Sequence, residues 1–190
     1  MEGTNQNKEK QKEEQPFWYV LRVTYQREMM AKKLLDEMNV TNFLPMQRVR
    51  RRNSQGKLQW MVLPAVHNYI FIYATRTEVD HIKQFKLEYL RYVVVRENGL
   101  KHILTVPEYQ MRNFIAIAGN EDEHKEFLTD LSAINFAEGD RVRILGGAFE
   151  GVEGIYVRTS NTKSRRVVVQ VGGLMAVATA TLPLAMVEKI

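Results

Sequence analysis

The chain has 190 residues, 45% of them hydrophobic, which supports one domain or two small ones. No apolar run approaches the roughly 20 residues that a membrane helix needs, the N-terminus is polar, and the absence of cysteine excludes disulfides and thiolate chemistry. We therefore expect a globular cytoplasmic protein without a membrane partner, whose net charge of +5 favours contact with polyanions.

The first part of the chain predicts a tail, a strand and a helix. Residues 1–16 alternate Glu, Lys, Gln and Asn, and they cannot bury enough apolar surface to fold, so we expect a disordered tail. Residues 17–23 are almost continuously apolar, which is typical of a central strand covered on both faces. Residues 27–39 predict an amphipathic helix. Its apolar stripe consists of Met30, Leu34, Leu35 and Met38.

A basic β-hairpin is predicted next, from two β-prone arms at residues 47–52 and 57–62 around a polar turn. Five cations lie on or beside it: Arg48, Arg50, Arg51, Arg52 and Lys57. Such guanidinium groups can hold nucleic-acid phosphates without reading sequence, and a solvated charged face is the alternative. Trp60 could stack on an unpaired base, but a packed strand aromatic is the favoured interpretation.

The elements up to residue 118 continue a mixed α/β pattern. Residues 68–73 predict a strand, and the spacing of Thr77 and Asp80 resembles a capping box that begins a second helix near residue 78. Residues 90–95 predict another strand, and Pro107 opens a third helix. The apolar stripe of that helix consists of Met111, Phe114, Ile115 and Ala118.

The last third of the chain predicts a linker and a small β-domain. Residues 119–134 are rich in Glu, Asp and Lys and are interpreted as an interdomain linker with room for one helical turn. Two β-prone runs, at residues 142–145 and 155–157, then flank a loop with several glycines. This strand, bent loop and strand predict the opening of a small β-barrel over residues 135–190.

In order and spacing, residues 138–157 resemble the KOW motif, the signature of SH3-like barrels in transcription factors of the NusG class and in several ribosomal proteins. A generic β-hairpin with a glycine-rich loop is the alternative. By itself the motif indicates transcription or translation without choosing between them.

The N-terminal part makes the resemblance more specific. Trp18-Tyr19-Val20 is similar to the first strand of NusG-type elongation factors, residues 43–45 to the stretch before their hairpin, and residues 68–72 to a later strand. With the linked KOW motif, the chain resembles that family over residues 17–190.

One stretch departs from the general family pattern. The family has Phe-Pro where this chain has Val66-His67. The run at residues 63–68 is similar instead to the specialised UpxY-type paralogues, which act on polysaccharide-synthesis operons.

The resemblance implies an α+β fold. An NGN-like α/β sandwich with an antiparallel sheet and helices covers residues 17–118. A linker covers residues 119–134, and a C-terminal SH3-like KOW β-barrel covers residues 135–190.

The resemblance also implies partners. The α/β domain of the family lays an apolar depression on the clamp helices of RNA polymerase and bridges the cleft around the nucleic acid. Residues in or near that depression are Phe43, Pro45, Tyr69 and Phe71. Ordinary core packing is the alternative for these side chains, and it is favoured for Phe71. DNA or nascent RNA in the elongation complex is the expected partner of the basic hairpin.

Loops of the family's barrel bind termination factor Rho or a small-subunit ribosomal protein. The corresponding residues are Phe149, Val152, Leu174 and Met175. Because Val152 and Leu174 replace aromatic residues, much of the flat apolar area for an interface hot spot is lost. We therefore predict against Rho binding, while a ribosomal protein stays a possible partner.

Nothing in the sequence indicates an enzyme or a cofactor. The four histidines, at positions 67, 81, 102 and 124, lack the spacing of a zinc site, and no serine elbow or phosphate loop occurs. The favoured function is a transcription elongation or antitermination factor that suppresses pausing or termination at a restricted set of operons, such as those for polysaccharide synthesis. A general NusG-like factor and a ribosome- or RNA-binding KOW protein are the alternatives.

Overall fold

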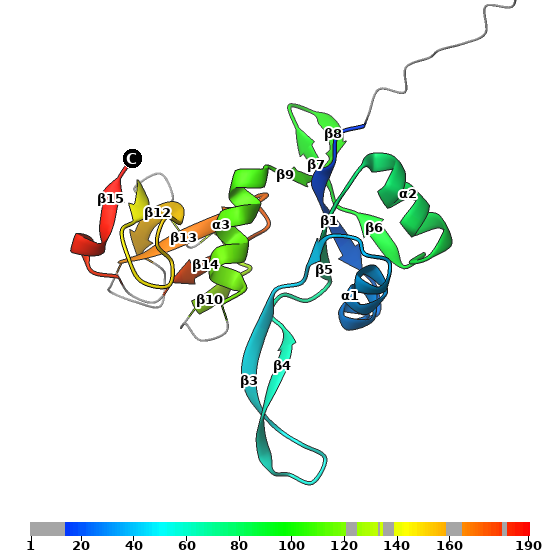
Figure 1. Cartoon of the computed structure of the whole chain (residues 1–190), viewed down its shortest axis with the longest axis horizontal. Coiled ribbons are helices and arrows are strands. Elements are labelled where there is room, and N and C mark those ends of the chain that lie inside the picture. Colours follow the sequence, from blue (N-terminus) through cyan, green and yellow to red (C-terminus); the bar gives the residue numbers. More distant parts are fainter. Residues whose placement is uncertain (1–13, 121–124, 133, 135–138, 159–164, 180–181) are drawn as a thin grey trace, which may run out of the picture.

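The computed structural model describes residues 14–120, 125–132, 134, 139–158, 165–179 and 182–190. In these residues the chain forms two units, with the third helix lying between them (Figure 1). Antiparallel sheets and three α-helices make the described part an α+β protein, which confirms the predicted class. Most of the predicted disordered tail falls outside the described residues.

The first unit is built on an antiparallel sheet centred on β1. Its strands are β1 (Phe17–Val23), β2 (Asn42–Phe43), β5 (Tyr69–Ala74), β6 (Leu90–Tyr92) and β9 (Thr105–Val106). The order is β2-β5-β1-β6, and β9 also pairs with β1. The bounds of β1 are those predicted from its apolar run, and β5 begins one residue later than expected.

Helices cover both faces of this sheet, as predicted for a continuously apolar central strand. They are α1 (Glu28–Glu37), α2 (Arg76–Phe85) and α3 (Glu108–Ala118). Because side chains alternate along a strand, Trp18 and Val20 join one core with α3, whereas Leu21 and Val23 join a second core with α1 and α2.

The buried face of α1 follows the predicted stripe except at one position. Leu34, Leu35 and Met38 pack in the core of the sheet, whereas Met30 is 54% exposed. Glu28 is buried in addition, and its Oε1 accepts the backbone N–H of Asn68 at 2.7 Å. Asn68 lies at the entrance to β5, where its φ is +69°. A polar residue therefore occupies a position that the apolar pattern could not assign to the core.

The second helix begins earlier than predicted. The Thr75 hydroxyl accepts the Glu78 N–H at 3.2 Å, and the Glu78 carboxylate accepts the Thr75 N–H at 2.8 Å. The capping box is thus formed by Thr75 and Glu78, and the predicted pair of Thr77 and Asp80 is wrong. Asp80 lies one turn further into α2.

Asp80 links α2 to β6, and we expect its contribution to the stability of the fold to be lost at acidic pH. Burial raises the pKa of its carboxyl, but hydrogen bonds from Arg76 Nε at 2.7 Å and the Tyr92 hydroxyl at 2.9 Å outweigh burial and hold that pKa below its ordinary value. A lowered folded pKa stabilises the protein above the unfolded pKa, and this contribution is lost as pH falls through the folded value. Asp80→Asn should therefore lower the free energy of unfolding by about 0.5 kcal/mol at neutral pH.

Urea unfolding of wild type and Asp80→Asn from neutral pH down to about pH 3 checks this contribution. The difference between the two proteins should shrink as pH falls. A difference that is constant across this range would contradict the role of the Asp80 charge.

Two hairpins extend from the first unit. The predicted basic hairpin is confirmed as β3 (Met46–Arg52) and β4 (Leu58–Pro64), and it projects away from the sheet (Figure 1). The predicted strand at residues 90–95 is divided between β6 and a second hairpin, formed by β7 (Val94–Glu97) and β8 (Leu100–Ile103). Its turn is Asn98-Gly99, with φ of +50° and +82°, the combination that tight hairpin turns favour.

The second unit is a six-stranded antiparallel sheet of order β10-β14-β13-β12-β11-β15. Its strands are β10 (Lys125–Leu128), β11 (Asp140–Ile144), β12 (Glu153–Arg158), β13 (Arg165–Val171), β14 (Met175–Thr179) and β15 (Val187–Lys189), preceded by the short 3-10 helix η2 (Leu184–Met186). The predicted strand, loop and strand are present as β11 and β12. Within the described residues, no pairing joins the end strands β10 and β15.

The predicted linker contains a strand rather than a helical turn. β10 pairs with β14, and Phe127 packs against the core cluster of α3. Charged residues flank this strand, and the partly buried Glu126 is satisfied by Arg166 Nη1 at 2.5 Å. The charge-rich segment therefore contains an edge strand. Its composition alone does not distinguish such a strand from a linker.

The two units share one hydrophobic core. A single cluster joins Trp18 and Phe71 of the first unit through Phe114 of α3 to Val169 and Val177 of the second. The backbone N–H of Glu153 also donates to Asn113 of α3. Thus the described C-terminal sheet packs against the first unit rather than lying apart from it.

Candidate functional site

The basic hairpin carries its cations on two faces. Residues directly opposite in a hairpin share a face. The pairs Arg48–Val62, Arg50–Trp60 and Arg52–Leu58 lie on one face, and Arg51 lies on the other with Gln59. Lys57 follows the turn. The structure therefore brings three of the five predicted nucleic-acid residues together around Trp60.

The cations of the hairpin are free to meet an anion. All five predicted residues are exposed, and within the described part of the chain none of them forms an ion pair. Arg52 Nη1 donates to the Gly56 carbonyl at 2.8 Å, which holds that guanidinium beside the turn. Arginines without carboxylate partners keep their donors available for phosphate oxygens.

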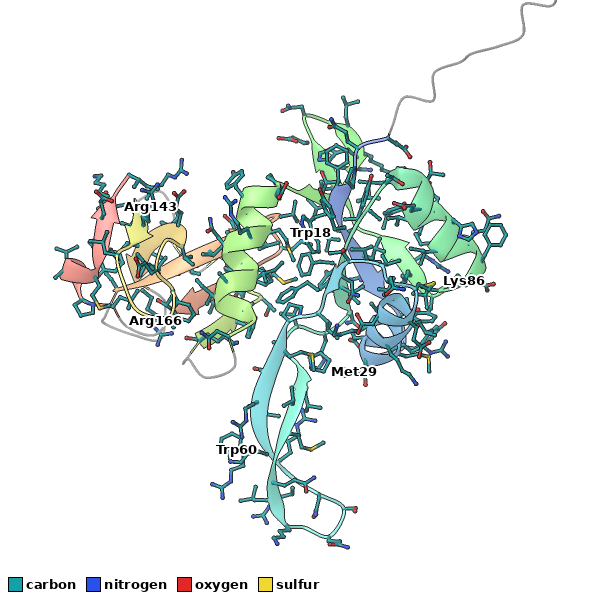
Figure 2. The ribbon with its side chains drawn as sticks, viewed as in Figure 1. Trp18, Met29, Trp60, Lys86, Arg143 and Arg166 are labelled. Carbon is teal, nitrogen blue, oxygen red and sulfur yellow. The ribbon has the colours of Figure 1, made fainter. Side chains whose placement is uncertain are left out.

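Trp60 is a second component of this face. Its side chain is 61% exposed, and the Arg48 guanidinium lies 5.4 Å from its ring centroid. Figure 2 shows Trp60 on the projecting part of the hairpin, away from both cores. The favoured interpretation of Trp60 as a packed strand aromatic is therefore wrong, because Trp60 belongs to none of the core clusters formed by the described residues.

The four residues predicted to contact polymerase lie together at the base of the hairpin but are largely covered. Phe71 is fully buried and Pro45 is buried, whereas Phe43 and Tyr69 are half-buried. The Phe43 ring lies 6.5 Å from Phe71 and 5.9 Å from Phe114, measured between centroids. The favoured assignment of Phe71 to the core is confirmed.

The second unit covers part of this apolar surface. A cavity of about 510 Å³ is lined by Ala65, Val66 and Tyr69 from the first unit and by Phe127 and Leu174 from the second. The Leu104 side chain also reaches Gly172, where a Cβ would lie 3.2 Å from its Cδ2. In this arrangement, Tyr69 faces another part of the same chain.

The residues predicted to bind a partner of the barrel are mostly buried as well. Phe149 is in the loop between β11 and β12, but its side chain is only 6% exposed, and Val152 and Met175 are also buried. Leu174 is half-buried beside the contact between the units. Burial of Phe149 leaves little of its ring for a partner in this arrangement, and its role in partner binding stays a prediction.

Within the described residues, no three His, Asp or Glu side chains gather as metal ligands, and His124 lies outside those residues. None of the described helices is long and apolar enough to cross a membrane. What the described surface offers instead is an uncovered arginine-rich hairpin with an exposed Trp, which is typical of proteins that work on nucleic acids.

The comparison with protein families agrees with a protein that works on nucleic acids. The model of the NusG family, described as transcription termination factor nusG, matches residues 16–115, which is more than half of the chain. The chain belongs to the NusG family. Members are transcription factors rather than enzymes, act on elongation or antitermination, and bind RNA polymerase and nucleic acids. The comparison with curated proteins gave no match.

The match ends within α3, so it covers the first unit with both hairpins and stops before the second sheet. It therefore places the exposed basic hairpin inside the family domain.

Proposed function

We propose that this protein is an elongation or antitermination factor that binds the clamp helices of RNA polymerase through residues 17–118 and suppresses pausing or termination. One observation carries the proposal. The family match covers the unit that bears the hairpin, and the arginines of β3 form no ion pair within the described residues. In the proposal, Phe43, Pro45, Tyr69 and Phe71 form or support the polymerase surface. The hairpin contacts DNA or nascent RNA.

We assign residues 135–190, the part of the second unit that follows β10, to an SH3-like KOW barrel that recruits another component, such as a small-subunit ribosomal protein. The glycine-rich turn between β11 and β12 supports this assignment, with φ near +81° at Gly147 and +80° at Gly151. Gly154 supports it too, because a Cβ there would lie 2.7 Å from Val167 on the neighbouring strand. The resemblance of residues 63–68 to UpxY-type paralogues favours action at polysaccharide-synthesis operons.

Binding to purified core polymerase tests the central claim. The full chain should be retained by immobilised polymerase and displaced by an excess of a general NusG, because both are expected to occupy the clamp helices. Tyr69→Ala should weaken retention, whereas Tyr109→Ala, at a 51% exposed position of α3, should not. Absence of competable retention by the wild-type chain would refute polymerase binding and favour a ribosome- or RNA-binding protein.

The restriction to particular operons has a separate test. Transcription of the operon next to the gene should depend on the protein more strongly than transcription of unrelated operons. A uniform effect would assign the protein as a general factor.

A further inference from the structure

The first unit carries a second projecting hairpin, at the other edge of its sheet. The short strands β6 and β9 take successive places beside β1, because β1 pairs with β6 through residues 21–23 and with β9 through residues 18 and 19. The β7–β8 hairpin leaves the sheet between these two strands, whereas the β3–β4 hairpin leaves between β2 and β5 at the opposite edge. Figure 1 shows the two hairpins on opposite sides of the first unit, so they are separate surfaces.

Two cations face each other across the β7–β8 hairpin. Arg96 on β7 lies directly opposite Lys101 on β8, and both residues are exposed. Within the described residues, neither side chain forms an ion pair or a hydrogen bond. Residues directly opposite in an antiparallel pair have Cβ atoms about 5 Å apart, and like charges at this separation destabilise the hairpin.

The carboxylate of this hairpin does not relieve the repulsion. Side chains alternate between the two faces of a strand, so Glu97 lies on the face opposite to that of Arg96. Its Oε2 lies 3.7 Å from His102 Nε2 on that other face. The tight turn at Asn98-Gly99 fixes the register of the two arms. The two cations are therefore held beside each other without a counter-charge.

A like-charged pair that lowers stability is expected where binding requires it. One anion between the two side chains would remove the repulsion, because each cation would then face an opposite charge. A phosphate has several acceptor oxygens, so it can accept hydrogen bonds from the Arg96 guanidinium and the Lys101 ammonium together.

The rest of the hairpin narrows the source of the phosphate. Residues 94–103 contain no Phe, Tyr or Trp on which an unpaired base could stack, so the contact is restricted to the phosphate backbone. A DNA duplex carries one charge per about 1.7 Å of its axis, twice the linear density of one of its strands. A pair of neighbouring cations therefore gains most from a duplex.

We propose that the β7–β8 hairpin binds the phosphate backbone of double-stranded DNA, with one phosphate held between Arg96 and Lys101. The contact does not read sequence, because phosphates are alike at every base pair. The inference goes beyond the proposed function, which places nucleic-acid contact on the β3–β4 hairpin. It rests on that function only in that the protein works on nucleic acid, and it does not need polymerase.

Fluorescence anisotropy of the full chain with a labelled DNA duplex of about 25 base pairs, without polymerase, tests the proposal. Arg96→Glu should weaken duplex binding about tenfold at about 50 mM salt and lower the slope of log K against log salt by about 0.9, since one phosphate contact is lost. Lys101→Glu should have the same effects, because the two cations share one phosphate.

The same variants separate binding from folding. Arg96→Glu replaces the repulsion across the hairpin with an ion pair to Lys101, so it should raise Tm by about 2 °C. A loss of duplex binding in a protein that is more stable than wild type cannot come from unfolding. An Arg96→Glu protein with a lower Tm would contradict the repulsion on which the proposal depends.

Lys33→Glu is the matched control, because it makes the same change in net charge on α1, where the Lys33 side chain is 77% exposed. It should leave the salt slope of duplex binding as in wild type. The proposal is overturned if Arg96→Glu binds the duplex like Lys33→Glu, or if the wild type does not bind the duplex at about 50 mM salt. A single strand of the same sequence is the second arm, and an effect of Arg96→Glu confined to that strand would also overturn the proposal.

The outcomes separate this site from the proposed function. Loss of polymerase retention with an intact effect of Arg96→Glu on duplex binding would refute the elongation-factor proposal alone. Polymerase retention together with equal duplex binding by Arg96→Glu and Lys33→Glu would refute the β7–β8 site alone.

Discussion

Replacing Phe114 with Ala should lower the free energy of unfolding by about 3–5 kcal/mol. The Phe114 side chain is fully buried, and its ring lies 5.7 Å from that of Phe71 and 5.9 Å from that of Phe43. The same cluster continues to Val169 of the second sheet. Loss of the ring removes buried area and leaves a cavity at the meeting point of both units.

Urea unfolding followed by circular dichroism measures the effect of Phe114→Ala, and Tyr109→Ala on the same helix is the control. Tyr109 is 51% exposed, so its removal should change stability little. Because Phe114 touches the first sheet and shares a core with the second, both units should unfold at lower urea. A loss below about 1 kcal/mol would contradict the shared core.

Charge reversal on the hairpin should have the largest effect on function. Arg50→Glu, Arg51→Glu and Arg52→Glu together should weaken association with an elongation complex about tenfold or more at low salt, because phosphate contacts are replaced by repulsion. The three residues are exposed and free of ion pairs within the described chain, so the fold should tolerate the change.

Titration of the elongation complex at about 50 and 200 mM salt measures the effect of the reversal. The variant should lose more affinity at the lower salt, since screening weakens the contacts of the wild type as salt rises. A control with the same change in net charge reverses the exposed Lys33, Arg112 and Arg141. Equal losses in variant and control, or an unchanged salt response, would refute phosphate contact by the hairpin.

Local pattern predicted the elements of the first unit well, because their signals are strong and short in range. β1 is recognisable from its apolar run, the basic hairpin from its turn, and α3 from Pro107 and the apolar stripe that follows. The hairpin β7–β8 was missed although Asn98-Gly99 is a strong turn signal. Its arms are mostly exposed, so they lack the alternation that marks a strand on a core.

Two of the differences concern contacts between distant residues. The burial of Glu28 in α1 depends on its hydrogen bond with Asn68, which lies 40 positions further along the chain. The position of β10 depends on β14, about 50 residues later. No pattern of neighbouring residues in the sequence indicates either contact.

The candidate sites were predicted to different degrees. Runs of arginine are visible in sequence, so the hairpin cations were found. The exposure of Trp60 depends on the way the hairpin projects from the sheet (Figure 1), which no local pattern indicates. The depression lined by Tyr25, Arg27 and Lys86 has no such signal, because its residues come from two connections about 60 positions apart. Only the positive φ of Tyr25 and Gln26, which sequence does not display, marks the first connection.

The position of α3 between two sheets has a consequence for affinity. If polymerase takes the surface around Tyr69, binding competes with Phe127 and Leu174 of the same molecule. The apparent dissociation constant then equals the intrinsic constant divided by the fraction of molecules in which that surface is open. A population of one open molecule in a hundred would weaken binding about a hundredfold, and a second ligand that holds the C-terminal sheet away would restore it.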